Sequence, residues 1–270
     1  MKHNRLSVNQ ICFPGATIAQ LESYWQQLQL QRVSCLSTLL ENDDGVLADV
    51  LSRNRFQLET IAHVFLSSGN LSISESVQAG RARLTELIRK AEQVNAHSIY
   101  MMTGGRGNLS WEQAADSFSE AIAPCIEQAK NAGIKLAIEN APAVYADVTL
   151  AHTLRDAIAL AEMAGIGICI ELFACWAEAG LRELFERALP RCVLVQVSDY
   201  VYGDRALPAR AVPGDGVIPL RQIVEWLQGI GYRGAFDLEI IGPRIDREGC
   251  FPAAQRAANY LDQILRELLV

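Results

Sequence analysis

The sequence has few of the residue patterns that build metal clusters or covalent catalytic sites. It contains only four histidines, and its seven cysteines form no C-x-x-C pair. Too few histidines are present for the multi-zinc cluster of an endonuclease, and the cysteines are expected to be buried free thiols. The glycine-rich loop Thr103-Gly104-Gly105-Arg106-Gly107 matches neither G-x-G-x-x-G nor G-x-x-x-x-G-K-[ST], and the motif G-x-S-x-G is absent from the chain. Nucleotide binding and serine-nucleophile hydrolysis are therefore not predicted.

An excess of positive charge is also missing. The chain carries 24 Lys and Arg against 31 Asp and Glu, a net charge of −7. This balance disfavours nucleic acid and anionic membranes as partners. No run of 18 uncharged apolar residues occurs, and no secretory signal is expected at the N-terminus. We expect a cytoplasmic protein whose partner is a small molecule, and leave open whether it forms a homo-oligomer.

Short apolar runs alternate with longer helical patterns along the whole chain. The later runs are apolar on both faces, which is typical of buried parallel strands. The predicted strands are Leu6–Phe13, Arg32–Ser37, Leu58–Leu66, His97–Thr103, Ile134–Asn140, Gly165–Phe173, Cys192–Asp199 and Gly234–Ile241.

Helix boundaries support this alternation. Thr17 with Gln20, and Ser110 with Gln113, form capping boxes that begin helices, and Gly165 ends one. Repeated strand–helix units predict a parallel sheet, and their number favours an α/β fold with a single (β/α)8 TIM barrel. An open, doubly wound sheet is the structural alternative. We expect one domain over residues 1–270.

Four consecutive predicted strands end in a polar residue: Glu139, Glu171, Gln196 and Glu239. In such a barrel these residues would lie at the catalytic end. Converging carboxylates need a counter-ion, and oxygen ligands suit Mn2+ or Mg2+ better than zinc. Without a metal, one carboxyl should instead hold a proton and have a raised pKa.

The segment VPGDGVIPLRQIVEWLQGIGYRGAFDLEI, Val212 to Ile240, resembles the end of xylose isomerase-like TIM barrels, the sugar phosphate isomerases/epimerases. AKNAGIKLAIEN, Ala129 to Asn140, is similar to the helix–Gly–strand unit that ends in the family's first metal ligand. The resemblance implies a divalent metal, Mn2+ or Mg2+, on Glu139, Glu171, Gln196 and Glu239. It also implies that Glu139 and Glu239 move protons.

Three positions differ from the commonest family pattern. Glu171 stands where Asp is usual, Gln196 where His is usual, and Ala174 where a supporting His is often found. Some relatives, notably bacterial 3-dehydroshikimate dehydratases, resemble this chain in having Gln there and an Arg shortly before the P-G-x-G loop, as Arg210 is here. The resemblance therefore implies a lyase as an alternative.

Other polar residues near the strand ends are candidates for supporting roles. Asp199 would orient a metal ligand or cap its loop. His63 would contact substrate or be a hydrogen-bonded residue of the barrel wall. Arg205 and Arg210 would grip a carboxylate, phosphate or enediolate oxygen, or be solvated loop residues.

These observations lead to three hypotheses. The first is a metal-dependent isomerase or epimerase of a sugar, polyol or related hydroxy-carbonyl compound, acting through an enediolate with Glu139 and Glu239 as acid/base pair. The second is a lyase or dehydratase of the same fold, resembling 3-dehydroshikimate dehydratase or cleaving a keto-glycoside. The third is a metal-free, non-catalytic sugar-binding barrel.

Overall fold

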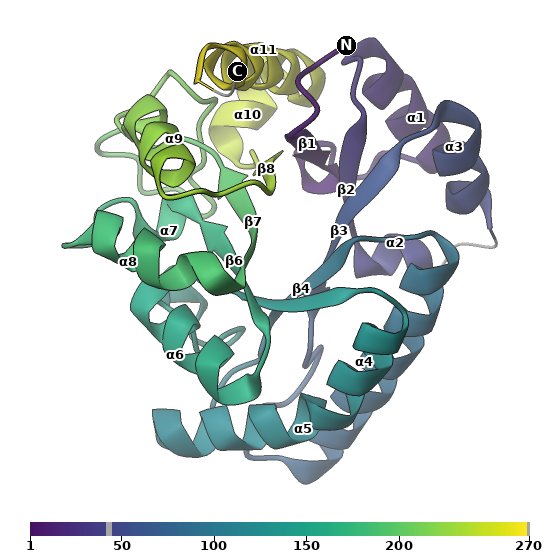
Figure 1. The fold of residues 1–270 in the computed structure, drawn as a ribbon, viewed down its shortest axis with the longest axis vertical. Coiled ribbons are helices and arrows are strands. Elements are labelled where there is room, and N and C mark those ends of the chain that lie inside the picture. Colours follow the sequence, from purple (N-terminus) through teal and green to yellow (C-terminus); the bar gives the residue numbers. More distant parts are fainter. Residues whose placement is uncertain (42–44, 269–270) are drawn as a thin grey trace.

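The computed structural model describes residues 1–41 and 45–268. Over these residues eight parallel strands pair in chain order, and the last pairs back onto the first to close a barrel (Figure 1). The strands are β1 (Leu6–Asn9), β2 (Arg32–Leu36), β3 (Gln57–Val64), β4 (Ser98–Met102), β5 (Lys135–Glu139), β6 (Gly167–Glu171), β7 (Cys192–Val197) and β8 (Ala235–Leu238). The predicted (β/α)8 barrel is confirmed, and each predicted strand contains one observed strand or most of it.

Helices surround the strands on the outside of the barrel (Figure 1). They are α1 (Ile18–Gln27), α2 (Ser37–Glu41), α3 (Val46–Asn54), α4 (Ser74–Gln93), α5 (Trp111–Asn131), α6 (Leu154–Ala164), α7 (Leu172–Cys175), α8 (Leu181–Ala188), α9 (Leu220–Gly229), α10 (Pro243–Glu248) and α11 (Cys250–Leu268). Short 3-10 turns occur at Gln10–Cys12, Ala143–Tyr145 and Leu189–Arg191. Within the described residues, no helix combines the length and the apolar character needed to cross a membrane.

The predicted helix boundaries are observed. Thr17 caps α1 and Ser110 caps α5. In each case the side-chain oxygen of the glutamine three residues later accepts the backbone N–H of the capping residue in return. Gly165 ends α6 in the left-handed conformation at φ 70°, which glycine adopts without steric cost. These caps fix where each helix returns the chain to the sheet.

The barrel has two apolar layers of different character. Between strands and helices, large side chains such as Trp25, Phe118 and Phe236 are fully buried. Inside the barrel, the packed side chains include small ones such as Ala62 and Ala137. Because side chains alternate along a strand, the residue two positions after an inward one also faces inward. This alternation places Glu139 above Ala137.

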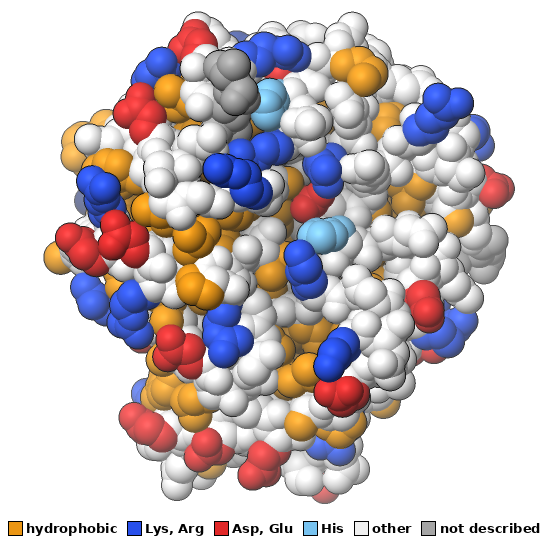
Figure 2. All heavy atoms as spheres, viewed as in Figure 1, with side chains coloured by type: hydrophobic (Ala, Val, Ile, Leu, Met, Phe, Trp, Pro, Cys, Tyr) orange, Lys and Arg blue, Asp and Glu red, His pale blue; other side chains and the backbone are white. Residues whose placement is uncertain are grey.

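Charged groups also gather where the strands begin. We call this end the floor and the opposite end, where the strands finish, the mouth. A cavity of about 460 Å3 at the floor is lined by basic residues together with the buried Glu59. Figure 2 looks onto this end and shows basic side chains and a histidine near its middle. The basic lining residues are Arg5, Arg32, His97, Lys135 and Arg233.

Candidate active site

The four predicted strand-end residues lie at the mouth and are buried. Glu139, Glu171 and Gln196 belong to β5, β6 and β7, and Glu239 directly follows β8. None of them is more than 5% exposed. The parallel strands thus bring residues that are 100 positions apart in the sequence to one end of the barrel.

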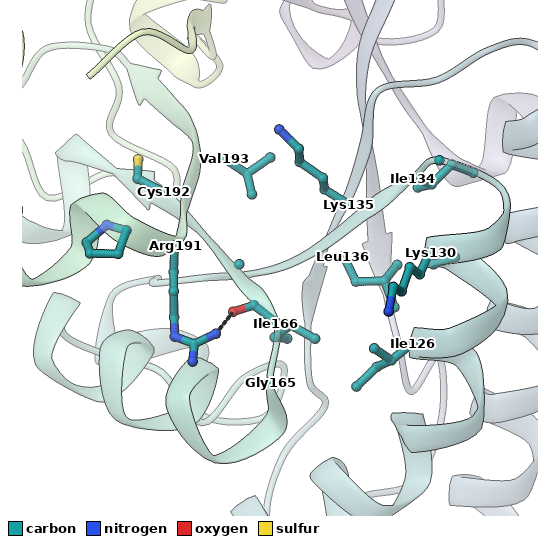
Figure 3. Close-up of a pocket in the computed structure, with 14 residues that line it drawn as sticks. Ile126, Lys130, Ile134, Lys135, Leu136, Gly165, Ile166, Arg191, Cys192 and Val193 are labelled. Atoms are coloured by element: carbon teal, nitrogen blue, oxygen red, sulfur yellow. Dashed lines mark hydrogen bonds between the residues drawn. The ribbon is translucent and has the colours of Figure 1, made fainter. Parts of the chain in front are cut away.

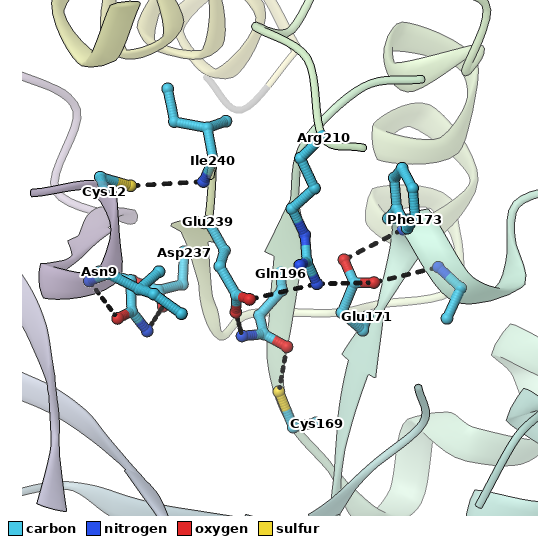
Figure 4. Close-up of polar contacts among 12 residues, drawn as sticks. Asn9, Cys12, Cys169, Glu171, Phe173, Gln196, Arg210, Asp237, Glu239 and Ile240 are labelled. Carbon is cyan, nitrogen blue, oxygen red and sulfur yellow. Dashed lines mark hydrogen bonds and ion pairs between the residues drawn. The ribbon is translucent and has the colours of Figure 1, made fainter. Parts of the chain in front are cut away.

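A fifth residue, Arg210, reaches between two of these glutamates (Figure 4). Its Nη2 lies 3.2 Å from Glu171 Oε2 and 3.1 Å from Glu239 Oε1. Arg210 is only 9% exposed, and its guanidinium lies 5.3 Å from the ring centroid of Phe173. The buried carboxylates therefore have a cation supplied by the protein itself.

Gln196 joins this cluster through the nitrogen of its amide. The Nε2 group donates to Glu239 and, at 3.0 Å, to the hydroxyl of Tyr100. The Oε1 atom accepts from the thiol of Cys169 at 3.3 Å. The amide oxygen is therefore bonded to a residue of the barrel interior, and the amide N–H groups face the carboxylate.

Glu171 is held on both carboxylate oxygens. It caps the short helix α7, accepting from the backbone N–H of Phe173 at 3.1 Å and of Ala174 at 3.0 Å. Its own backbone exchanges two hydrogen bonds with the side chain of Asn140, at 2.9 and 3.0 Å. Glu171 is thereby fixed in position before any ligand binds.

Burial and mutual repulsion determine the protonation of the cluster. Burial raises the pKa of Glu139 well above its usual range, and the charges of Glu239 and Glu171 add to this effect. Burial raises the pKa of Glu171 to about 7, although Arg210 opposes the rise. Burial acts to lower the pKa of Arg210, but the three glutamates raise it above its ordinary value. The cluster thus combines an arginine whose charged form is favoured with a glutamic acid, Glu139, whose protonated form is favoured.

Asp199 lies outside the cluster and organises the loop that carries Arg210. Its carboxylate accepts backbone N–H bonds from Gly214, Gly216 and Ile218 at 2.9–3.0 Å. Its backbone pairs with Ala211 in an antiparallel bridge. A side chain at Gly216 would collide with the Asp199 carboxylate, so glycine is required there. Of the two predicted roles, capping the loop is the one these contacts support.

The structure does not bring His63 to the cluster. Its neighbour Ala62 packs inside the barrel, so His63 faces the helices and its Nδ1 lies 3.0 Å from Ser37 Oγ. Burial, with a smaller contribution from Arg83 on α4, lowers the pKa of His63 to about 3. The apolar run around His63 gave no sign of which face it occupies, and the observed alternation assigns it to the outer one.

Arg205 lies at the rim of the mouth. It is exposed, and its Nη1 donates to the hydroxyl of Tyr200 at 2.7 Å. With Arg210, Phe173 and Tyr145, it lines a cavity of about 340 Å3 beside the cluster. Figure 3 shows another pocket, around Lys135 and Arg191, which lies at the floor and includes none of the four strand-end residues.

The donors present do not fit the predicted Mn2+ or Mg2+ ion. Such an ion needs free oxygen ligands. The Gln196 oxygen instead accepts from a thiol, and both Glu171 oxygens accept backbone N–H bonds. Arg210 already occupies the space between Glu171 and Glu239. Within residues 1–41 and 45–268, no three His, Cys, Asp or Glu side chains are grouped so that they could hold a metal.

Sequence reasoning missed several residues around the cluster. Tyr100 and Cys169 contact Gln196 from the barrel interior. Asp237 is fully buried two residues before Glu239, and it accepts from Ser34 Oγ at 2.8 Å and from Asn9 Nδ2 at 3.2 Å. The alternation of side chains along β8, applied backwards from Glu239, would have indicated Asp237.

Comparison with known proteins agrees with this architecture. The profile of a family described as xylose isomerase-like TIM barrel matches residues 41–264, more than half of the chain. None of the curated proteins matches the sequence.

Several solved structures share the fold at low sequence identity. The IOLI protein with a bound zinc atom has a TM-score of 0.80 at 14% identity, covering 99% of both chains. D-psicose 3-epimerase with D-tagatose from Clostridium cellulolyticum H10 has a TM-score of 0.79 at 15% identity, covering 98% of this chain and 99% of its own. The probable 3-DHS dehydratase AsbF from Bacillus anthracis has a TM-score of 0.75 at 13% identity, covering 97% and 98%. These likenesses establish the fold alone.

Proposed function

Because this chain belongs to the xylose isomerase-like TIM barrel family, we propose that it is an enzyme that moves a proton at the carbon beside a carbonyl group. Its substrate is a sugar, a polyol derivative or a related small hydroxy-carbonyl compound, and its reaction is an isomerisation or epimerisation. The observation that carries the proposal is the pair of buried glutamates, Glu139 and Glu239, beside the buried cation of Arg210. The similarity in fold to D-psicose 3-epimerase supports it.

The two glutamates have different surroundings, which suits opposite roles. Glu239 lies in an ion pair with Arg210 and accepts from Gln196, so we assign it the carboxylate form and the role of base. Burial raises the pKa of Glu139 well above its usual range, so Glu139 carries a proton at neutral pH and acts as the acid. Pairs of carboxyl groups whose surroundings separate their pKa values are a recurrent acid/base arrangement.

The reaction step is proton abstraction followed by proton return. Glu239 takes the proton from the carbon, and the electron pair of the broken C–H bond forms a C=C bond. The carbonyl oxygen becomes negatively charged, and Glu139 gives it a proton, which forms an enediol. For the epimer, a proton from solvent adds to the other face of the same carbon, and the former carbonyl oxygen gives its proton back to Glu139, which restores the C=O bond. For the isomer, a proton adds to the former carbonyl carbon, and the hydroxyl on the carbon that first lost its proton gives up its own, so the C=O bond forms there. No mass is gained or lost.

The experiment that tests this proposal is solvent isotope exchange. A panel of ketoses, aldoses and keto-polyols is incubated with the protein in D2O, and carbon-bound deuterium is detected by NMR. We expect one class of compound to incorporate deuterium, and Glu239→Gln to abolish the incorporation while the thermal midpoint stays close to that of the unaltered protein. Full activity in Glu239→Gln would show that this residue is not the base.

A dehydratase or other lyase is the second candidate. The similarity in fold to AsbF, with Gln196 and Arg210 present as in the dehydratases that the sequence resembles, favours it. In this reaction the same C–H electron pair expels a β-hydroxyl, which leaves as water with a proton from Glu139. Mass spectrometry of the product separates the two candidates, because the lyase product is lighter by one water and the isomerase product has an unchanged mass.

The proposal includes four further predictions about the chain. Residues 1–270 act as one domain, the partner is a small molecule, the location is cytoplasmic, and Arg205 contacts the substrate at the rim. The third hypothesis, a non-catalytic binding barrel, predicts binding of a carbonyl compound without deuterium exchange, and the same experiment tests it.

A further inference from the structure

The cation in the carboxylate cluster is an arginine that is built into the fold. Arg210 Nη2 contacts Glu171 and Glu239 at 3.2 and 3.1 Å, and its guanidinium lies over the ring of Phe173. The backbone next to it is fixed, because Ala211 pairs with Asp199. The position of this charge therefore follows from the loop structure and not from an isolated side-chain contact.

This arrangement leaves no room for a second cation at the same place. A divalent ion binds carboxylate oxygens at about 2.0–2.6 Å. The oxygens of Glu171 and Glu239 that face one another already share one guanidinium nitrogen. An ion bridging the same two oxygens would have to displace the arginine or lie against it, and like charges repel strongly in a buried site. Glu171 and Glu239 therefore hold either Arg210 or a metal, and the observed contacts hold Arg210.

Arg210 also keeps a donor free for a ligand. Its Nε is buried and, among the described residues, has no hydrogen-bond partner. An unpaired buried N–H is costly, and a bound ligand is one way to satisfy it. Arg210 lines the 340 Å3 cavity beside the cluster, together with Phe173, Tyr145 and Tyr200. An oxygen acceptor of a ligand in this cavity would complete the hydrogen bonds of the guanidinium.

We propose that Arg210 replaces the divalent cation in this barrel: it neutralises Glu171 and Glu239 and binds the carbonyl oxygen of the substrate, so that the protein neither binds nor needs a divalent metal. The part that concerns the substrate rests on the proposed function, and the part that concerns metal binding does not. Since two carboxylates already face the guanidinium, the substrate class that fits is an uncharged hydroxy-carbonyl compound and not a phosphate ester.

The test measures binding of Mn2+ alone to the purified full chain by calorimetry, with elemental analysis of the protein as isolated. We expect no stoichiometric metal, no saturable Mn2+ binding, and no change in thermal midpoint on adding EDTA or Mn2+. One Mn2+ per chain bound at micromolar concentration, with a higher thermal midpoint, would overturn the proposal.

The Arg210→Met variant, which removes the charge but keeps much of the bulk, sharpens the test. The carboxylates then lack a cation, so we expect the variant to bind Mn2+ saturably. Its affinity should exceed the upper limit measured for the unaltered protein at least about tenfold, which is about 1.4 kcal/mol. Arg210→Lys keeps a positive charge and is expected to bind no Mn2+. This variant is used for the Mn2+ measurement if Arg210→Met does not fold. Arg221→Met is the matched control, because Arg221 also contacts two glutamates but on the exposed surface of α9. Arg210→Met that folds and binds Mn2+ no better than Arg221→Met would contradict the proposed role of Arg210.

The outcomes separate this inference from the proposed function. Deuterium exchange that requires added Mn2+ would contradict the inference about Arg210 but would agree with the proposed function. If the protein neither bound Mn2+ nor exchanged deuterium into any compound, the result would contradict the proposed function. It would still agree with the part of the inference that concerns metal binding.

Discussion

The two ends of the barrel both collect buried charge but use it differently. At the floor, Arg5 donates to the backbone carbonyls of Gly234 and Tyr232 at 2.7 and 3.2 Å, and Arg32 pairs with the buried Glu59. At the mouth, Arg210 pairs with Glu171 and Glu239, and Glu139 lies outside these two ion pairs.

This difference distinguishes charge that stabilises from charge that reacts. The floor charges are satisfied by the chain itself, which is the pattern expected where a barrel end serves stability. At the mouth, burial raises the pKa of the Glu139 carboxyl, and the buried Nε–H of Arg210 has no hydrogen-bond partner within residues 1–41 and 45–268. Unsatisfied polar groups of this kind are costly to maintain and are typical of functional sites.

The largest effect that this comparison predicts is the loss of turnover in Glu139→Gln. Removing the acid should lower kcat by about 10²–10⁴-fold, the usual contribution of general acid–base catalysis. The thermal midpoint should stay the same or rise, because glutamine avoids a buried carboxyl. Turnover assays and calorimetry check this, with Glu225→Gln on the exposed face of α9 as control. A variant that kept normal turnover would remove Glu139 from the mechanism.

Asp237, buried inside the barrel below Glu239, should make stability depend on pH. Burial raises the pKa of Asp237 to about 7 from an ordinary value of 3.8, so the folded protein binds a proton that the unfolded chain releases. Stability from this group is complete below pH 3.8 and falls as pH rises to about 7, at about 1.4 kcal/mol for each pH unit. Asp237→Asn removes this slope.

Thermal midpoints measured between pH 4 and 8 test this second prediction. The thermal midpoint of Asp237→Asn should rise relative to that of the unaltered protein as pH increases through this range. Above about pH 7 the difference between the two midpoints should stay constant. Asp215→Asn is the control: Asp215 pairs with Arg256 on the surface, and that hydrogen bond lowers its pKa. Parallel pH profiles for Asp237→Asn and the unaltered protein would show that Asp237 does not hold the proton.

A smaller effect, on stability alone, is expected at the floor. Glu59→Gln leaves Arg32 without its carboxylate partner, and Arg32 is partly exposed to water. We therefore expect a loss of only about 1 kcal/mol in the free energy of unfolding, measured by urea titration, with kcat and KM unchanged. A large loss of activity in Glu59→Gln would end the functional distinction between floor and mouth.

The smallest effect is predicted for Arg205→Ala at the rim of the mouth. Because Arg205 is exposed, its contact with substrate is worth less than about 1 kcal/mol. KM should rise about threefold with kcat and the thermal midpoint unchanged. Steady-state kinetics against Arg221→Ala, which alters an exposed arginine away from the mouth, check this expectation; a fall in kcat instead would place Arg205 in the chemical step.

The fold and the four strand-end residues could be predicted because local patterns encode them. Each strand is an apolar run bounded by helix caps, and parallel strands bring their ends to one side. The residues Glu139, Glu171, Gln196 and Glu239 therefore lie together at the mouth, as expected, and their catalytic roles stay predictions.

The central position of Arg210 could not be predicted, because it depends on contacts between distant segments. Arg210 was expected to bind a carboxylate, phosphate or enediolate oxygen, or to be a solvated loop arginine. Its burial results from the bridge between Asp199 and Ala211 and from the carboxylates of β6 and β8. For His63 the sequence left two roles open, substrate contact and a hydrogen-bonded place in the barrel wall, and the contact with Ser37 supports the second. The sequence could not choose between them, since a strand that is apolar on both faces does not indicate which side chains point inward.

The anchoring of the mouth loop by Asp199 has a consequence for redesign of this barrel. Because Asp199 holds residues 211–218 from one side, the exposed tip around Tyr202 and Leu207 can be lengthened, shortened or exchanged while Arg210 stays in place. Replacing the segment between residues 201 and 207 would therefore vary which molecules enter the mouth. The cluster of Arg210 with Glu171 and Glu239 would keep its structure in every such variant.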